Sequence, residues 1–382
     1  MKFGLANMAK LCDALGHPEA AFKSVLIAGT NGKGSVTAML DTALRAAGHR
    51  VARYTSPHLV RLEERFVLDG CEVDSQSLAR CAARVQRVVE ELVASRTLEA
   101  LPTFFECTTA VAFELFRDAG IEIAVLEVGL GGRLDATNIV SPIAGAIVSI
   151  DFDHQAQLGN SLASIAGEKA GIARRGIPIV CGEMPAEARD VIAAICRERG
   201  AIMIEAGRDL GVATRVAAAR PLALPGRHQA ANAAVAVRLL DALSDEGIHV
   251  DEAAIRSGLM ETKWPGRLET FNVQGCRVLL DAAPEGVTLV FAAMKDKAIA
   301  EMLAALRPVA RRVLCTTAPT PRAMDAASLA AVARDAGCDV DVAPDPVEAL
   351  QRACATGLPV VVAGSIFLIG PVRERLAHGI LR

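Results

Sequence analysis

The sequence has few aromatic residues, no marked excess of charge and no long hydrophobic run. Aromatic side chains make up only 3% of the 382 residues, too few for a surface that stacks nucleic-acid bases. The net charge of −3 likewise provides no basic patch for a polyanion. The longest apolar stretch, at 357–370, has 14 residues, is interrupted by glycine and is too short to span a bilayer. We therefore expect no nucleic-acid partner and no membrane partner.

Signals for disulfides and for secretion are also missing. The 10 cysteines are scattered without a C-x-x-C pair, mostly in apolar surroundings, as expected of reduced core thiols. No N-terminal stretch combines a basic start, an apolar middle and a small-residue cleavage site. Because 52% of the residues are hydrophobic and 22% are charged, the chain can bury a sizeable core. These features predict a globular, enzyme-sized, cytoplasmic protein.

Short β-branched runs alternate with helical patterns along most of the chain. In the first half, strands are predicted at 24–28, 49–55, 121–128, 145–150 and 177–181, and helices at 35–47, 75–94 and 106–119. This alternation predicts an α/β fold whose mostly parallel sheet is covered by helices on both faces. The only tryptophan and a Pro-Gly turn near 262–270 mark a boundary. We predict a large N-terminal domain over 1–265 and a smaller C-terminal domain over 266–382.

Two strands of the second half lie very close together in the sequence. The runs 277–282 and 287–294 both look like strands, yet only 4 residues separate them. Parallel neighbours need a crossover of about a dozen residues or more, usually a helix. Either the two strands form a hairpin, or a crossover helix is missing.

The strongest chemical motif is GTNGKGS, which follows a strand, precedes a helix and consists of Gly29, Thr30, Asn31, Gly32, Lys33, Gly34 and Ser35. A glycine-rich turn in this context aims backbone N–H groups and a helix dipole at one point, which suits a polyphosphate. Lys33 adds a charge for the β/γ-phosphates. The spacing is shorter than in the general phosphate loop, and the alternative is a glycine-rich turn with an incidental lysine.

Glu127 lies at the end of a buried strand, in the segment IAVLEVGLGGRLDATN. A carboxylate there is costly unless it is paired or binds a metal, and strand ends of open α/β sheets are where ligands bind. A magnesium ligand is one interpretation. A buried glutamate held by Arg133 or another partner is the other. Asp135 and Asn138, in the next loop, can hold a nucleotide or cap a helix.

A third polar cluster follows the strand at 145–150, on the same predicted sheet edge. It contains Asp151, Asp153 and His154, and a histidine beside a metal carboxylate can itself be a ligand. Lys169 lies on a helical pattern, where an exposed lysine is the default interpretation. Weaker signals occur in three loop-like segments. Ser56 in TSPHLVRLEER is either a metal ligand or a cap, and Arg267 in WPGRLE either holds phosphate or is an ordinary surface arginine. The third segment, GRHQAANA at 226–233, contains several polar groups.

Together these segments resemble the folylpolyglutamate synthase/dihydrofolate synthase family of the Mur-ligase superfamily. The resemblance covers almost the whole chain in order, through FGLANMAKLCDALGHPE, GTNGKGS, TSPHL with EER, TFFECTTAVAF, LEVGLGGRLDATN, DHQAQLG, IAGEKAGI, GRHQAANA, WPGRLE, FAAMKDK, PRA and AGSIFLIG. It implies a P-loop-type N-terminal domain and a Rossmann-like C-terminal domain, in a monomer with its active site between the domains. Domain closure would then assemble the site.

The activity implied by the resemblance is ATP-dependent amide ligation. A substrate carboxylate attacks the γ-phosphate of ATP to give an acyl phosphate, which the amine of L-glutamate then attacks. The carboxylate belongs to dihydropteroate or to the terminal glutamate of a folate. ATP and Mg²⁺ are the implied cofactors, with a second Mg²⁺ and a monovalent cation such as K⁺ as options. The protein contributes positioning and charge neutralisation.

The resemblance also implies individual roles. Gly29 to Ser35 is similar to the phosphate loop, with Lys33 on the β/γ-phosphates, and the implied magnesium ligands are Ser56, Glu127 and His154. Lys169 matches a lysine that is carbamylated in the family, which would give it a carboxylate-like group for a second metal. The implied nucleotide contacts are Asn232, Arg267 and Asp281. Lys33, Glu127, His154 and Lys169 are our candidate catalytic residues.

The chain departs from the family pattern in two places. Glu63 stands where the family usually has asparagine, a change that can affect the folate side. The family's Asp-x-Ala-His-Asn-Pro appears here as DAAPEG at 281–286, without the histidine, the asparagine or the helix expected before FAAMKDK. Three functions follow: an active glutamate ligase on folates, a nucleotide-binding relative that has lost catalysis, or a Mur-type ligase with another carboxylate substrate.

Overall fold

The computed structural model of the chain describes residues 4–98, 100–266, 269–273, 276–280 and 286–378. It separates into two compact units, of which unit 1 comprises Met1–His58 and Leu62–Trp264, and unit 2 comprises Leu59–Arg61 and Pro265–Arg382. No helix in the part of the chain described has the length and apolar character needed to cross a membrane.

Unit 1 is built on one eight-stranded sheet with the order β4-β3-β2-β5-β1-β6-β7-β8. The six strands from β2 to β8 in this order are parallel, whereas β3 and β4 form an antiparallel edge. Their bounds are β1 Lys23–Ala28, β2 Val51–Tyr54, β3 Phe66–Leu68, β4 Cys71–Glu72, β5 Ile123–Glu127, β6 Pro142–Ile147, β7 Pro178–Cys181 and β8 Ile202–Glu205. The five strands predicted in this half are all present.

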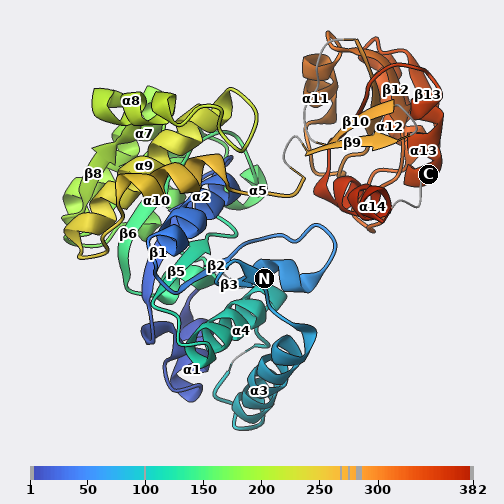
Figure 1. Cartoon of the computed structure of the whole chain (residues 1–382). Helices are drawn as coiled ribbons and strands as arrows, with labels where there is room; N and C mark the ends of the chain where they lie inside the picture. The colour runs from blue at the N-terminus through green and yellow to red at the C-terminus, as the bar shows by residue number, and fades with distance from the viewer. Residues whose placement is uncertain (1–3, 99, 267–268, 274–275, 281–285, 379–382) are drawn as a thin grey trace. The chain divides into compact units, whose positions relative to one another are not determined.

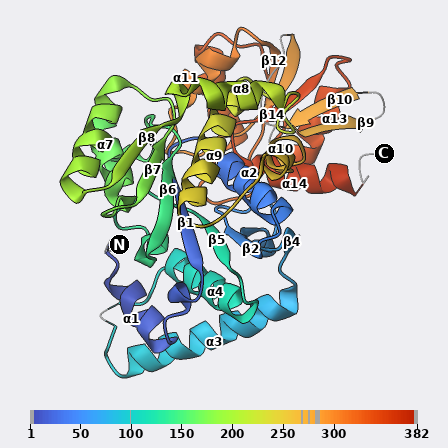
Figure 2. The ribbon, with the colours of Figure 1, turned by 60° about the vertical axis from the view of Figure 1, so that its left-hand side comes forward.

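Helices cover both faces of this sheet, as Figures 1 and 2 show. The helices are α1 Ala6–Ala14, α2 Lys33–Ala46, α3 Ser75–Ala94, α4 Phe104–Asp118, α5 Gln155–Leu158, α6 Leu162–Lys169, α7 Ala186–Arg199, α8 Leu210–Ala218, α9 His228–Asp245 and α10 Glu252–Met260. Successive strand residues point to opposite faces, so β1 buries Leu26 against the side of α1, α3, α4, α6 and α7, and Val25 against the side of α2, α8, α9 and α10. Burial on both faces explains why the strands are apolar throughout.

The order of the strands in this sheet indicates where a ligand is expected to bind. β1 lies between β5 and β6 at the centre, where the connections leave toward opposite edges of the sheet. Ligands of open α/β sheets bind beyond the carboxyl ends of the strands at such a switch point. The residues that follow Ala28, Glu127 and Ile147, at the carboxyl ends of β1, β5 and β6, therefore lie where a ligand is expected to bind.

Unit 2 contains a six-stranded sheet with the order β13-β12-β11-β14-β10-β9, in which only β9 is antiparallel. Its strands are β9 Glu269–Val273, β10 Cys276–Leu280, β11 Val287–Phe291, β12 Ala310–Cys315, β13 Val340–Val342 and β14 Val360–Ala363. Its helices are α11 Ile299–Leu306, α12 Ala326–Asp335, α13 Pro346–Cys354 and α14 Ile366–Ala377. One face packs on α13 and α14, and the other on α11 and α12. The predicted fold class, two α/β domains with mostly parallel sheets, is confirmed.

The hairpin predicted as one alternative for the two close strands of unit 2 is wrong. β10 and β11 both pair with β14, in parallel and on opposite sides of it. Leu280 and Val290 pair with the same residue, Val362, so β10 and β11 run parallel and their connection is a crossover rather than a hairpin turn. Such a parallel crossover usually takes a helix, and the sequence between these two residues is too short to contain one.

Candidate functional site

The GTNGKGS segment forms the turn between β1 and α2. Gly32 is the N-cap of α2 with φ of +83°, a backbone conformation that favours glycine, and it supplies no side chain to cap the helix. The first N–H groups of α2 are therefore not occupied by a capping side chain of Gly32. A helix N-terminus of this kind attracts an anion through its N–H groups and its dipole.

Two lysine side chains converge on one carbonyl of this loop. Nζ of Lys33 donates to the carbonyl oxygens of Gly29, at 3.0 Å, and Thr30, at 3.1 Å. Nζ of Lys169 donates to the same Gly29 oxygen at 2.9 Å. The ammonium group of Lys33 at a helix N-terminus makes this an electropositive spot, which suits a polyphosphate.

Lys169 is buried, with 4% of its surface exposed, so the default expectation of a surface lysine is wrong. Burial and, next in size, the nearby charge of Lys33 lower its pKa to about 7, against the opposing effect of Asp153 and Asp135. A substantial fraction of the amine is therefore uncharged at neutral pH. An uncharged amine is the form that can act as a nucleophile.

The segment after β6 holds the loop in place. The Ser149 hydroxyl accepts from the N–H of Asn31 at 2.9 Å and donates to its carbonyl at 3.0 Å. The Thr30 hydroxyl accepts from the N–H of Asp151 and donates to its carbonyl, both at 3.1 Å. Asp151 was singled out in the sequence for its carboxylate, but its backbone makes these contacts. The role of Ser149 was missed, although it lies two residues before Asp151 on the same sheet edge.

α9 contributes a polar pair behind the loop. The Nε2 group of Gln229 donates to the hydroxyl of Ser35 at 3.3 Å, and Asn232 donates to Gln229 at 2.9 Å. A Cβ on Gly32 would overlap the Asn232 side-chain oxygen, so this glycine is required by the close approach of α9. The structure thus places Asn232 directly against the loop. Gln229 was missed, although it stands in the same HQAAN segment.

Glu127 is the last residue of β5 and is 6% exposed. The N–H of Ser56 donates to its Oε2 at 3.4 Å. The two residues meet because β2 and β5 are parallel neighbours, so the chain after β2 emerges beside the end of β5. Arg133, considered from the sequence as a partner for Glu127, forms its ion pair with Glu168 at 2.8 Å.

His154 lies at the start of α5 and follows Asp153. Its Nε2 is 3.6 Å from Oδ2 of Asp153, and its side chain is 40% exposed. In the residues described, no three His, Cys, Asp or Glu side chains form a metal-binding group. The predicted ligand set has only two side chains of those types, Glu127 and His154, together with the hydroxyl of Ser56 and Lys169. A carboxylate and a hydroxyl oxygen are chemically suited to Mg²⁺.

Asp135 and Asn138 are tied into the loop that contains them. Asp135 accepts from the N–H of Leu130 at 2.8 Å and from the N–H of Thr137 at 3.0 Å. Asn138 donates to the carbonyls of Arg133 and Gly171. Burial raises the pKa of Asp135, against the effect of these hydrogen bonds. Of the two roles open for Asp135, the structure shows capping of the short helix Ala136–Ile139. Arg267 and Asp281 lie outside the described residues.

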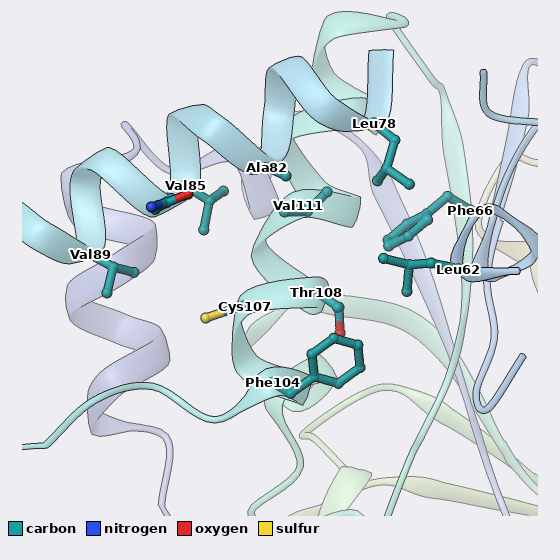
Figure 3. Close-up of a pocket in the computed structure, with 11 residues that line it drawn as sticks. Leu62, Phe66, Leu78, Ala82, Val85, Val89, Phe104, Cys107, Thr108 and Val111 are labelled. Atoms are coloured by element: carbon teal, nitrogen blue, oxygen red, sulfur yellow. The ribbon is translucent and has the colours of Figure 1, made fainter. Parts of the chain in front are cut away.

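A separate pocket of about 270 Å³ lies between α3 and α4 in unit 1. Figure 3 shows its wall of mostly apolar side chains, which come from α3, α4 and the segment before and within β3: Leu62, Phe66, Leu78, Ala82, Val85, Gln86, Val89, Phe104, Cys107, Thr108 and Val111. The Thr108 hydroxyl is engaged by the Tyr54 hydroxyl at 2.8 Å. The pocket therefore offers little hydrogen bonding and suits an apolar group, unlike the phosphate loop.

The sequence is similar to curated ligases over nearly its whole length. Residues 269–366 match the family model described as Mur ligase, glutamate ligase domain. The dihydrofolate synthase/folylpolyglutamate synthase of Bacillus subtilis is 32% identical over 412 aligned positions, which cover 98% of this chain and 95% of the relative. The protein of the same name from Mycobacterium tuberculosis is 33% identical, with 97% and 89% covered.

The fold is also similar to solved structures over nearly the whole chain. Mycobacterium tuberculosis folylpolyglutamate synthase complexed with ADP and AMPPCP has a TM-score of 0.89 at 29% identity, over 98% of this chain and 95% of that one. An Escherichia coli relative in complex with DHPP and ADP scores 0.85 at 29%, over 100% and 94%. A bifunctional folylpolyglutamate synthase/dihydrofolate synthase with Mn, AMPPNP and L-glutamate bound scores 0.83 at 30%, over 99% and 95%.

Proposed function

The chain belongs to the dihydrofolate synthase/folylpolyglutamate synthase family, and we propose that it is an ADP-forming ligase that joins L-glutamate to dihydropteroate, to the glutamate tail of folates, or to both. The observation that carries this proposal is the convergence of Lys33 and Lys169 on the Gly29 carbonyl at the start of α2. There Lys33 can neutralise charge on the phosphates of ATP, with Lys169 directly beside it. Family membership confirms the resemblance recognised in the sequence.

The ligands of the relatives support the substrates and cofactors. ADP, AMPPCP and AMPPNP in those structures support ATP, Mn supports a divalent metal, and L-glutamate and DHPP support the other two substrates. We propose Mg²⁺ as that metal in this chain, and a second Mg²⁺ and a monovalent cation such as K⁺ as further options. We further propose that the protein acts as a monomer in the cytoplasm.

The phosphate-binding part of the reaction has candidate residues in unit 1. The backbone of Gly29 to Ser35 holds the β- and γ-phosphates, and Lys33 balances the charge that moves onto the leaving phosphate. The substrate carboxylate attacks the γ-phosphorus, the bond to the β-phosphate oxygen breaks, ADP leaves, and an acyl phosphate forms. The amine of glutamate then attacks the acyl carbon and inorganic phosphate leaves, giving the amide. Positioning and charge neutralisation supply most of the acceleration in such transfers.

Ser56, Glu127 and His154 would hold Mg²⁺, together with Lys169 once it is carbamylated. Bound there, Mg²⁺ would neutralise charge on the phosphate oxygens. The fit is supported by the buried carboxylate of Glu127, which already lies within reach of Ser56. Lys169 is buried beside the loop with an amine that is partly uncharged near neutral pH, the form that reacts with carbon dioxide.

The deciding experiment is phosphate release from ATP and Mg²⁺, measured with and without L-glutamate. Dihydropteroate and tetrahydrofolate are tested separately, because the pterin that supports turnover distinguishes the two ligase activities. We expect release that requires both glutamate and a pterin. Absence of turnover with every pterin would rule out the proposal.

One feature favours a second candidate, a nucleotide-binding homologue without ligase turnover. The connection between β10 and β11 is too short for a crossover helix, and the alignment with the Bacillus subtilis relative spans 412 positions against 382 residues in this chain. The relative therefore carries residues that have no counterpart here. Binding of ADP without turnover would support this candidate, and glutamate-dependent turnover would exclude it. Ligation onto a non-folate carboxylate, motivated by Glu63, is excluded by turnover with either pterin.

A further inference from the structure

α10 and the segment after it run along α2 toward the phosphate loop. A Cβ on Gly258 would lie 2.6 Å from Cβ of Ala43 and 2.8 Å from the carbonyl oxygen of Met39, so the two helices are in backbone contact there. The hydroxyl of Thr262 then lies 3.5 Å from the carbonyl of Ala38, one residue closer to the start of α2 than Met39. From Gly258 to Thr262 the chain therefore comes nearer to the N-terminal end of α2.

Trp264 is where this segment reaches the loop. A Cβ added to Gly34 would overlap the Trp264 ring, with Cε2 at 2.9 Å and Nε1 at 3.2 Å. The indole therefore occupies the space that any side chain at position 34 would need. Gly34 separates Lys33 from Ser35 in the motif, so the ring packs directly against the part of α2 whose N–H groups face an anion.

The Trp264 ring is also linked to α2 through Arg53, which binds Asp41 two turns after Gly34. The guanidinium of Arg53 lies over the Trp264 ring, 5.4 Å from its centroid. Arg53 donates to Asp41 of α2 at 3.0 Å, and the Asp41 side chain is fully buried. A cation over an indole face is attracted electrostatically by the ring. Trp264 is thus held between Gly34 and an arginine that is itself anchored on α2.

We propose that Trp264 is a positioning residue, which sets the first turn of α2 for phosphate binding from behind Gly34. The inference rests on the proposed binding of nucleotide at this loop. The position of Trp264 also matters for the domain organisation, because unit 2 continues from the next residue, Pro265. Phosphate binding at the loop is thereby coupled to the last residue of unit 1.

The test measures the affinity of the full chain for ADP with Mg²⁺ by titration calorimetry. We expect Trp264→Ala to weaken ADP binding by about 10- to 100-fold, because misplacing a positioned group by about 1 Å can cost up to about 100-fold. Trp264→Phe keeps an aromatic ring and is expected to stay within about threefold of the wild type. Lys263→Ala changes the exposed neighbour and is the matched control, with no change expected.

A double-variant cycle with Gly34→Ala separates positioning from a general loss of structure. Gly34→Ala alone forces the ring away and weakens binding, but it costs less in the Trp264→Ala background because the overlap is gone. Wild-type ADP affinity in a folded Trp264→Ala variant overturns the inference. Failure of the wild type itself to bind ADP points instead to failure of the proposed function. If Trp264→Ala does not fold, Trp264→Leu carries the same test.

Discussion

Lys169 shows how an environment changes the chemistry of a residue. It is one of only 8 lysines in the chain, and its helical context gave no reason to expect burial. In the fold it donates to the Gly29 carbonyl, 140 positions earlier in the chain. Burial and the charge of Lys33 lower its pKa from 10.5 to about 7. The result is a lysine that titrates near neutrality beside the phosphate loop.

This shift predicts a pH-dependent stability. The folded state binds fewer protons than the unfolded state between pH 7 and 10.5, so Lys169 disfavours folding most below pH 7, and the penalty is lost as the pH rises through that window. The unfolding free energy of the wild type should therefore rise relative to that of Lys169→Met between pH 6 and pH 9. The slope is at most about 1.4 kcal/mol per pH unit.

Urea unfolding in buffers free of carbon dioxide measures this difference without carbamylation of the amine. Lys23→Met, at an exposed position at the start of β1, is the control and should show no such trend. A difference between wild type and Lys169→Met that is independent of pH would contradict the predicted shift.

Lys33 gives the prediction for activity. Its side chain already points at the loop carbonyls, so replacing it should remove charge neutralisation without moving the backbone. We expect Lys33→Ala to reduce kcat/KM for ATP by about 100- to 1,000-fold, as for other preorganised charge-stabilising groups. Glutamate-dependent phosphate release is the measurement. Lys23→Ala should retain wild-type activity, and a loss of less than tenfold in Lys33→Ala would argue against its role.

At the scale of elements, the strands and helices of both units could largely be predicted because they follow local patterns. β1 and β5 are continuous apolar runs, as expected of strands buried on both faces. What could not be predicted is which elements meet. The contact of α10 with α2 depends on Gly258, and nothing in the sequence around Gly258 shows which helix it faces.

A pair of glycine substitutions tests this helix contact. Gly to Ala inside a helix normally stabilises by about 0.5–1 kcal/mol. That gain is expected at Gly167 of α6, where a Cβ would meet only the Ile195 side chain at 4.0 Å. Gly258→Ala should instead destabilise by about 1–3 kcal/mol, because the new Cβ meets the backbone of α2. Urea unfolding gives both values, and a stabilised Gly258→Ala would show that α10 does not pack so closely.

At the scale of the whole molecule, each unit has its own pair of hydrophobic cores. The phosphate loop, its two lysines and Asn232 all belong to unit 1. Units with separate cores can unfold in separate steps. The single tryptophan of the chain, Trp264, also lies in unit 1, so its fluorescence reports the unfolding of that unit.

Nucleotide should therefore stabilise the transition seen by tryptophan fluorescence. At 100 times the dissociation constant, a ligand that binds only the folded state adds about 2.7 kcal/mol. Thermal unfolding with and without ADP and Mg²⁺ measures the shift, and Lys33→Ala should reduce it. An unchanged fluorescence transition at saturating ADP would contradict nucleotide binding in unit 1.

The sequence by itself determined the alternation of strands and helices and the family, and it located the GTNGKGS turn between a strand and a helix, because these follow from local residue order and from motifs that recur in order along the chain. Tertiary structure decided the burial of Lys169, the packing of Trp264 on Gly34 and the placement of β10 and β11 on either side of β14. These features arise from contacts between residues far apart in the chain. Local patterns carry no information about such partners, since the same periodicity fits many pairings of faces and edges.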